Sequence, residues 1–335
     1  MALPQGYTVE KVFGQTGPLA DGLVRFWVGN GALDEAGARQ RVNHVACVLK
    51  NGNGDIRGVC SIVATALPLL GNRNIWVYRQ FLPDTDRSYE AFVALFNGTR
   101  EIAQNLLEKE GAQKAPTGIF VILPDEAMAR RYPQAFWPET ALFYAGRTSQ
   151  GQHCRIAWLD EPGGWADVHR ELEPGFSMEW VFGKVDEKLA EEIVSFWLAE
   201  GAIKEDRARQ RVPEAAKIGR DPNGTLAGVC TLQYRQTPRL NNMPLWHVRA
   251  FVSKPHRRSS LAFCLLHTTV DDMQVLYDTG EERRAPGFFM EVENPSLRQL
   301  THQGLWAYRR FAYLGDDARG NHLRVQYFKG AELNF

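Results

Sequence analysis

The sequence lacks the features of a membrane protein and of a protein that binds nucleic acid over a broad basic surface. No stretch of its 335 residues approaches the ~18–20 consecutive apolar residues that span a bilayer. Its start has no basic segment followed by an apolar one, so we expect no signal peptide. The 39 basic side chains only balance the 39 acidic ones, whereas neutralising phosphates needs a basic excess. We therefore expect a cytoplasmic protein with no membrane partner; nucleic acid stays open as a partner but is not indicated by charge.

Cysteine is scarce, and familiar catalytic motifs are missing. The five cysteines are odd in number, widely spread and free of any Cys-x-x-Cys spacing, which favours reduced thiols. No Walker loop, Gly-x-Ser-x-Gly or His-Glu-x-x-His motif occurs, and the eight histidines show no metal spacing. These absences predict a protein without a metal.

What the sequence does contain is an internal repeat. The run ARQRV at 38–42 recurs unchanged at 208–212, 170 positions later, and the register holds without a gap from Phe26 to Arg87. Further matches are Phe26-Trp27 with Phe196-Trp197, Gly58-Val59-Cys60 with Gly228-Val229-Cys230, Trp76 with Trp246, Arg79 with Arg249, and Arg87 with Arg257. This period is too long for a solenoid, whose units have ~20–50 residues. The chain is therefore predicted to hold two copies of one domain, at residues 1–162 and 175–335.

Both copies predict the same order of elements: a strand, two helices, three strands, a long helix, a strand, a short helix and two closing strands. The long helices are expected at 89–110 and 260–277, and the strands that follow them at 118–123 and 287–292. The first helices, at 19–32 and 191–202, should stop at Gly31 and Gly201. The fold class is α/β (mixed α+β), with a mixed central sheet flanked by helices in each domain.

This order resembles the GNAT (Gcn5-related N-acetyltransferase) superfamily. In that family, a Gln/Arg-x-x-Gly-x-Gly/Ala pattern wraps the pyrophosphate of acyl-CoA with backbone N–H groups at a helix N-terminus. Arg257, Ser260 and Ala262 fall on the three signature positions, with Ser260 in place of a glycine. The resemblance implies that acetyl-CoA or another acyl-CoA binds the second copy at Phe251, Val252, Arg257, Arg258, Ser259, Ser260, Leu261, Ala262 and Asn294. In the first copy Glu90 and Phe92 make this loop degenerate.

The resemblance also points to groups for acid–base chemistry. Acyl transfer to an amine needs a base, and Glu291 and Glu293 alternate on the predicted strand so that both lie on one face. His247 is a second candidate for the base. In many family members a tyrosine protonates the departing thiolate; that position is Thr301 here, with His302 as its neighbour, and Tyr132 in the first copy.

Arginines repeat in the second-helix region, which in this family helps to line the acceptor site. Arg209 and Arg211 are therefore candidates to bind an acidic acceptor, as are their counterparts Arg39 and Arg41. The alternative is an intradomain salt bridge that both copies kept.

The favoured function is an acyl-CoA-dependent N-acyltransferase, a monomer or homodimer, that acts on an amine of a small molecule or of a modified base. One alternative is a GNAT-like transferase that uses another donor or acts on nucleic acid. The other is a non-catalytic binding protein built from two such domains. The identity of the acceptor is not encoded in any motif of the sequence.

Overall fold

The computed structural model describes residues 3–123, 126–160, 171–300, 302–306 and 311–333. The chain divides into two compact units: the first is mainly Met1–Glu161, and the second is mainly Pro162–His302 with Trp306–Asn334. Among the described residues, no helix is long and apolar enough to cross a bilayer.

Each unit repeats the order of elements that the sequence predicts, with one additional two-residue strand. The first unit contains β1 (Thr8–Lys11), α1 (Ala20–Gly29), α2 (Glu35–Val42), β2 (Val45–Lys50), β3 (Ile56–Leu67), β4 (Arg73–Phe81), α3 (Tyr89–Glu110), β5 (Gly118–Leu123), α4 (Glu126–Arg131), β6 (Phe136–Trp137), β7 (Leu142–Arg147) and β8 (His153–Trp158). The second unit contains β9 (Ser177–Trp180), α5 (Glu187–Ala199), α6 (Glu205–Arg211), β10 (Ala215–Arg220), β11 (Leu226–Thr237), β12 (Met243–Val252), α7 (Leu261–Thr279), β13 (Gly287–Val292), α8 (Pro295–Leu300), β14 (Leu305–Trp306), β15 (Phe311–Asp316) and β16 (His322–Tyr327).

The two sheets have the same topology. Their strand orders are β1-β2-β3-β4-β5-β8-β7-β6 and β9-β10-β11-β12-β13-β16-β15-β14. The central pairs β4–β5 and β12–β13 are parallel, whereas their neighbours pair antiparallel. In the second unit the parallel register joins only Trp246 to Phe288 and His247 to Phe289. The later halves of β12 and β13 are therefore not hydrogen-bonded to each other as a ladder.

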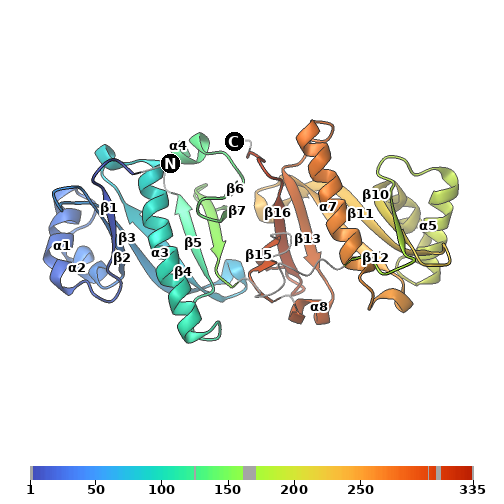
Figure 1. Cartoon of the computed structure of the whole chain (residues 1–335), viewed down its shortest axis with the longest axis horizontal. Helices are drawn as coiled ribbons and strands as arrows, with labels where there is room; N and C mark the ends of the chain where they lie inside the picture. Colours follow the sequence, from blue (N-terminus) through green and yellow to red (C-terminus); the bar gives the residue numbers. More distant parts are fainter. Residues whose placement is uncertain (1–2, 124–125, 161–170, 301, 307–310, 334–335) are drawn as a thin grey trace. The chain divides into compact units, whose positions relative to one another are not determined.

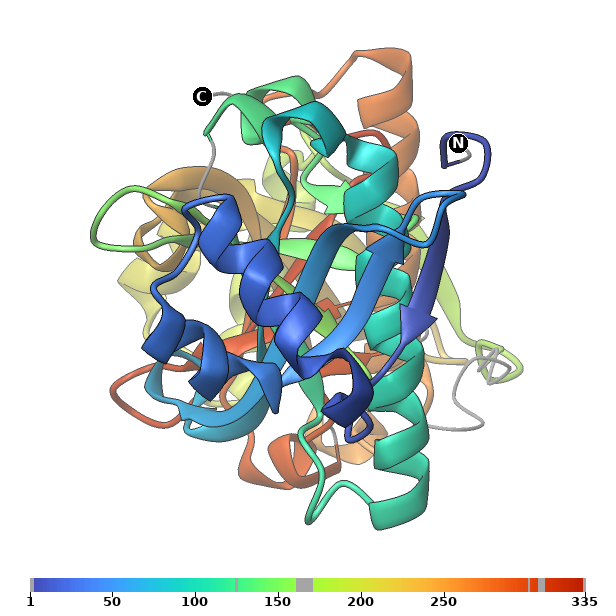
Figure 2. The same cartoon turned by 90° about the vertical axis from the view of Figure 1, so that its left-hand side faces the viewer.

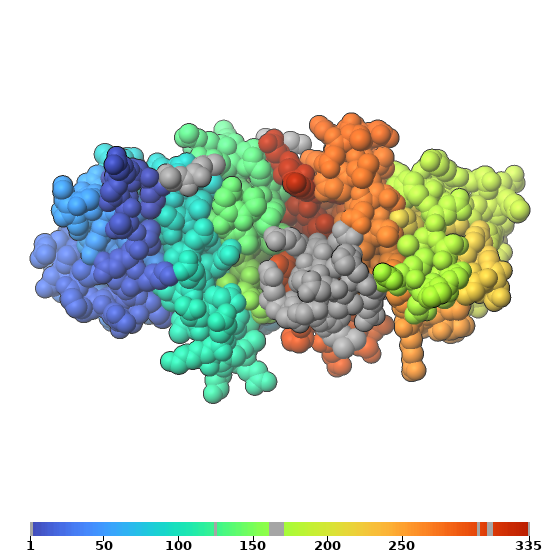
Figure 3. Space-filling view, viewed as in Figure 1, coloured from blue at the N-terminus to red at the C-terminus, as the bar shows by residue number. Residues whose placement is uncertain are grey.

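Helices cover both faces of each sheet. In the first unit α1 and α2 pack on one face around Leu23, Trp27 and Val59, and α3 packs on the other face around Phe96 and Ile119. Figure 2 shows α1 and α2 (dark blue) on one side of β2–β4 and α3 on the other. In the second unit α5 and α6 share a core with β10 and β11, and α7 lies along the sheet (Figure 1). Figure 3 shows that α3 and α7 form part of the surface of their units.

Most of the repeated residues make repeated core contacts. Phe13 meets Trp76 edge-on at 5.8 Å between ring centroids, and Phe182 meets Trp246 at 5.6 Å. The same holds for the pairs Phe26–Phe81 and Phe196–Phe251, both at 5.8 Å. Packing therefore explains why these aromatic positions recur.

The predicted helix ends are close to the observed ones. Gly31 and Gly201 have φ of +67° and +62°, a left-handed conformation that ends α1 and α5 as expected. α5 begins at Glu187, earlier than expected, because Asp186 caps it by accepting a hydrogen bond from Leu189 N at 2.8 Å.

Candidate functional site

The first candidate site is the loop that joins β12 to α7. A Cβ at Gly228 would lie 2.7 Å from Leu265 Cδ1 and 3.3 Å from Leu261 Cδ2. The bare glycine therefore lets the first turns of α7 pack tightly on the sheet, with Leu261 fully buried. This packing fixes the start of α7 just beyond the end of β12.

The side chain of Ser260, the residue that precedes α7, does not cap the helix. Ser260 precedes the helix and is 7% exposed, and its buried hydroxyl has no hydrogen-bond partner among the described residues. Lys254, Arg257 and Arg258 are exposed just before it. Uncapped N–H groups and the helix dipole favour an anion at such an end.

Two carboxylates already lie against this loop. Ser260 N donates a hydrogen bond to Glu173 Oε1 at 3.3 Å, and Lys254 N donates to Glu200 Oε2 at 2.9 Å. The backbone of the loop therefore presents N–H groups to side-chain oxygens, and the chain's own side chains occupy those of Lys254, Ser260 and Leu261.

The other residues that the sequence predicts to bind the cofactor lie in and around the same loop. Phe251 packs edge-on against Phe196, and Val252 is buried at the end of β12. Arg257 reaches back to Val252 O, with its Nε 3.4 Å away. Ser259 Oγ accepts a hydrogen bond from Leu261 N at 3.2 Å, while Ala262 is half-buried in the first turn of α7.

Asn294 has a local role in the structure. Its Oδ1 accepts hydrogen bonds from Ser296 N at 2.9 Å and from Leu297 N at 3.3 Å. These contacts cap the start of α8, so the Asn294 side chain is engaged by its own helix.

The corresponding loop of the first unit is built differently. Ser88 caps α3, since its Oγ accepts a hydrogen bond from Ala91 N at 3.1 Å. Asp86 is buried and forms an ion pair with Arg57 at 2.7 Å. Tyr132 stacks on Tyr89, the first residue of α3, with 4.1 Å between ring centroids. The first loop thus has its own cap and a buried acid near the helix start.

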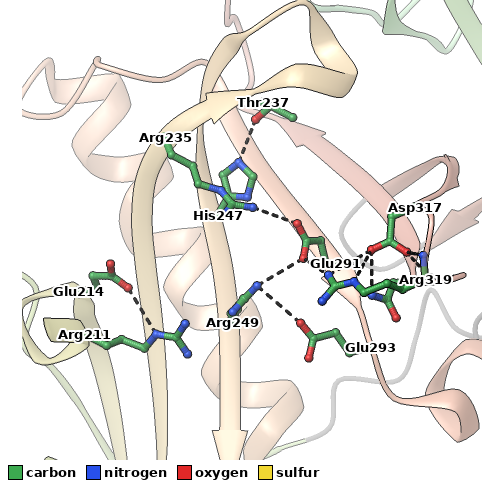
Figure 4. A network of polar contacts seen from close by, with 11 residues as sticks. Arg211, Glu214, Arg235, Thr237, His247, Arg249, Glu291, Glu293, Asp317 and Arg319 are labelled. Atoms are coloured by element: carbon green, nitrogen blue, oxygen red, sulfur yellow. Dashed lines mark hydrogen bonds and ion pairs between the residues drawn. The ribbon is translucent and has the colours of Figure 1, made fainter. Parts of the chain in front are cut away.

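A polar network occupies the β11–β13 face of the second unit (Figure 4). Glu291 is at its centre and forms ion pairs with Arg235 at 2.9 Å, with Arg249 at 3.3 Å and with Arg319 at 3.5 Å. Arg249 also reaches Glu293 at 3.5 Å, so the two glutamates lie on one face of β13 and its extension, as the alternation predicts. The Glu291 side chain is 14% exposed and that of Glu293 57%, so only Glu293 is open to solvent.

The two predicted acceptor-site arginines differ in their surroundings. Arg209 on α6 forms an ion pair with Glu191 on α5, which joins the two helices, and a second ion pair with Glu205 within α6. Arg211 points to the network and lies 3.7 Å from Glu214 (Figure 4). Burial lowers the pKa of Arg211, and repulsion from Arg249 adds to this effect. Arg211 therefore belongs to the polar face, whereas Arg209 holds helices together.

The candidate histidines are also in different environments. His247 is buried, its Nε2 lies 2.9 Å from Thr237 Oγ1, and burial lowers its pKa to about 3. Such a weak base accepts a proton from an ammonium group poorly near neutral pH. His302 is exposed, with Nδ1 3.0 Å from Gln299 O, and Thr301 lies outside the described residues.

Sequence reasoning missed several members of these sites. Arg235, Arg319 and Asp317 come from a strand and a turn whose side chains meet only in the folded sheet. Of the network arginines missed as site residues, only Arg249 had a signal in the sequence, because it is the repeat counterpart of Arg79. Among the described residues, no group of three or more His, Cys, Asp or Glu side chains is placed to hold a metal.

Each unit has a mixed sheet with a short parallel pair at its centre. This topology fits the fold that the resemblance to the GNAT superfamily implies. No protein-family model matches the sequence, and no curated protein matches it significantly.

Solved structures resemble parts of this chain at low identity. A GCN5-related N-acetyltransferase from Sphaerobacter thermophilus is 12% identical, with a TM-score of 0.29, and the match covers 83% of this chain and 85% of that one. A GNAT-family acetyltransferase from Streptococcus pneumoniae is 14% identical, with a TM-score of 0.33, over 46% of this chain and 99% of that one. The ribosomal-protein-S5-alanine acetyltransferase from Vibrio fischeri is 11% identical, with a TM-score of 0.32, over 47% and 94%.

Proposed function

We propose that the second GNAT-like unit is an acyltransferase that uses acyl-CoA and acts on an amine. The observation that carries this proposal is the start of α7, where basic side chains surround the helix end and the buried Ser260 hydroxyl has no hydrogen-bond partner among the described residues. An anion of the size of a pyrophosphate finds N–H donors and positive charge there.

Each part of the loop has a role in this proposal. The backbone N–H groups at Ser260–Ala262 would hold the phosphates after Glu173 and Ser259 release those of Ser260 and Leu261, and Arg257 and Arg258 would add charge-assisted contacts. The unpaired halves of β12 and β13 would admit the extended part of the donor. Bound acyl-CoA would supply an activated thioester carbonyl to the amine.

Glu293 is the better base of the two glutamates. Amine attack forms a C–N bond, breaks the C–S bond and requires the ammonium proton to leave. The oxygens of Glu291 already form ion pairs with three guanidinium groups, whereas Glu293 is solvent-exposed and pairs with Arg249 alone among the described residues. Glu293 would take the proton, directly or through water, while Glu291 holds the arginines in place; His302 is the candidate to protonate the thiolate.

A second candidate function is a binding protein without catalysis. It is favoured by one specific observation: the carboxylate of Glu173 accepts a hydrogen bond from Ser260 N, at the place where a phosphate would bind. Under this hypothesis the chain's own acid replaces the cofactor permanently.

Melting of the full chain with and without acetyl-CoA separates the two functions. The proposal predicts a rise in melting temperature that Arg257→Ala reduces, together with release of free thiol when an amine panel is added. No shift with acetyl-CoA or with longer acyl-CoAs contradicts the proposal. Co-purifying nucleic acid, seen as a polynucleotide that nuclease digests, would instead favour a transferase with another donor.

A further inference from the structure

The first unit carries two arginines that the repeat preserves but that have no polar side-chain partner among the described residues. Arg41 on α2 corresponds to Arg211, and Arg79 on β4 corresponds to Arg249. The second pair belongs to the ionic network around Glu291. Arg41 and Arg79 make no ion pair and no side-chain hydrogen bond with any residue that the structure describes. Core packing explains the repeated aromatic positions, but neither core packing nor a salt bridge explains why these two arginines recur.

The acids of the second network have no acidic counterparts in the first unit. The repeat places His44, Ile122, Pro124 and Thr148 where the second unit has Glu214, Glu291, Glu293 and Asp317. Of the four arginines, Arg235 and Arg319 are replaced by Thr65 and Gln150, whereas the other two remain. In the second unit the positive charges of four arginines and the negative charges of four carboxylates cancel. In the first unit two of these arginines remain and none of the carboxylates does, which leaves two positive charges.

Main-chain hydrogen bonds place the backbone segments that carry Arg41 and Arg79 next to each other. His44 N donates a hydrogen bond to Arg41 O, and Ile62 N donates to His44 O, both at 2.9 Å. Ser61, the neighbour of Ile62, pairs directly with Arg79 across the β3–β4 ladder. Arg41 is half-buried, and both burial and the charge of Arg79 lower its pKa. The two guanidinium groups thus share one region of the sheet face without a counter-charge.

Exposed apolar side chains lie on the same face. Val63 is 43% exposed and pairs with Val77, which stands two residues before Arg79. Val77 pairs in parallel with Phe120, and Ile122, two residues further on, is 37% exposed. The second unit has Gln233 and Glu291 at the positions of Val63 and Ile122. Apolar surface beside two unpaired cations suits an anion that carries an apolar part.

We propose that the first unit binds a small organic anion, with a carboxylate or phosphate head group held by Arg41 and Arg79 and an apolar part over Val63 and Ile122. Guanidinium groups bind both kinds of head group through two parallel N–H donors. This site uses neither the α7 loop nor any residue of the second unit, so it stands independently of the proposed acyl transfer.

Side-chain NMR of the arginine Nε–Hε groups in the full chain tests the proposal. Acetate, hexanoate and inorganic phosphate are titrated at constant ionic strength. We expect saturable shifts at Arg41 and Arg79 and none at the exposed Arg25, and hexanoate should bind at least about threefold more tightly than acetate because of its apolar chain. The phosphate and acetate titrations then identify the preferred head group.

Matched variants complete the test. Arg79→Gln changes an exposed side chain, so the fold should be retained, and hexanoate binding should weaken about tenfold or more. Arg25→Gln should bind as the wild type does. Shifts that grow linearly and equally at Arg25, Arg41 and Arg79, or an Arg79→Gln protein that binds hexanoate like the wild type, would overturn the proposal.

Discussion

Replacing Glu173 by glutamine should tighten the binding of acyl-CoA. The carboxylate of Glu173 accepts a hydrogen bond from Ser260 N, at the helix end proposed for the pyrophosphate. Two unit charges 4 Å apart repel each other by about 1 kcal/mol in water, and a pyrophosphate brings about two charges to this end. With screening by salt, the substitution should lower the free energy of binding by about 1–2 kcal/mol, which is roughly a 5–30-fold gain in affinity.

Isothermal titration calorimetry with acetyl-CoA measures this gain. The gain should shrink when salt is raised, because the repulsion is between exposed charges. Glu171→Gln is the matched control: this exposed acid lies two residues away, and the structure gives it no contact with the loop. Without ligand, Glu173→Gln should destabilise the protein by about 0.3–1 kcal/mol, because a negative charge leaves a helix N-terminus. An unchanged affinity, or an equal gain from Glu171→Gln, refutes the reasoning.

Three further predictions concern the second unit and the packing. Glu293→Gln should reduce kcat about 100-fold or more in a thiol-release assay, whereas Glu291→Gln should destabilise the fold by about 1 kcal/mol, because it removes ion pairs with Arg235, Arg249 and Arg319, whose side chains are partly exposed; the reverse pattern would assign the base to Glu291. The pKa of His247 falls from 6.5 to about 3 on folding, so between these two pH values the imidazole is protonated in the unfolded chain and neutral in the native state. Chemical denaturation should therefore show a loss of stability as pH falls through that window, at about 1.4 kcal/mol per pH unit, and His247→Gln should lose this component; an unchanged slope counts against a neutral buried imidazole. Gly228→Ala should cost about 1–3 kcal/mol through its clash with the first turns of α7, while Gly29→Ala, with open space around it, should cost nothing in the same assay.

The sequence predicted the fold well because the repeat supplied each element twice. The expected long helix at 89–110 and the strands at 118–123 and 287–292 have the bounds observed for α3, β5 and β13. Two sequence copies with one pattern of apolar spacing constrain the elements more strongly than one copy does. Short strands of two residues, such as β6, carry too little periodicity to be found this way.

The candidate site was less accessible to sequence reasoning. Alternation placed Glu291 and Glu293 on one face, which the shared contact with Arg249 confirms. The same reasoning did not predict Arg235 and Arg319 around Glu291, since these side chains come from distant segments and meet only through strand pairing. The contact of Glu173 with Ser260 was equally hidden, because it joins the segment before the sheet to the start of α7.

A crystal of the full chain soaked with acetyl-CoA tests the central claim most directly. The account predicts pyrophosphate density at the start of α7, against the N–H groups of Ser260–Ala262, with Glu173 displaced. It also predicts no such density at the start of α3, where Ser88 caps the helix and Asp86 lies close by in the chain. Density at α3, or an empty α7 loop at saturating acetyl-CoA, would contradict the claim that the second unit is the acyl-CoA-binding unit.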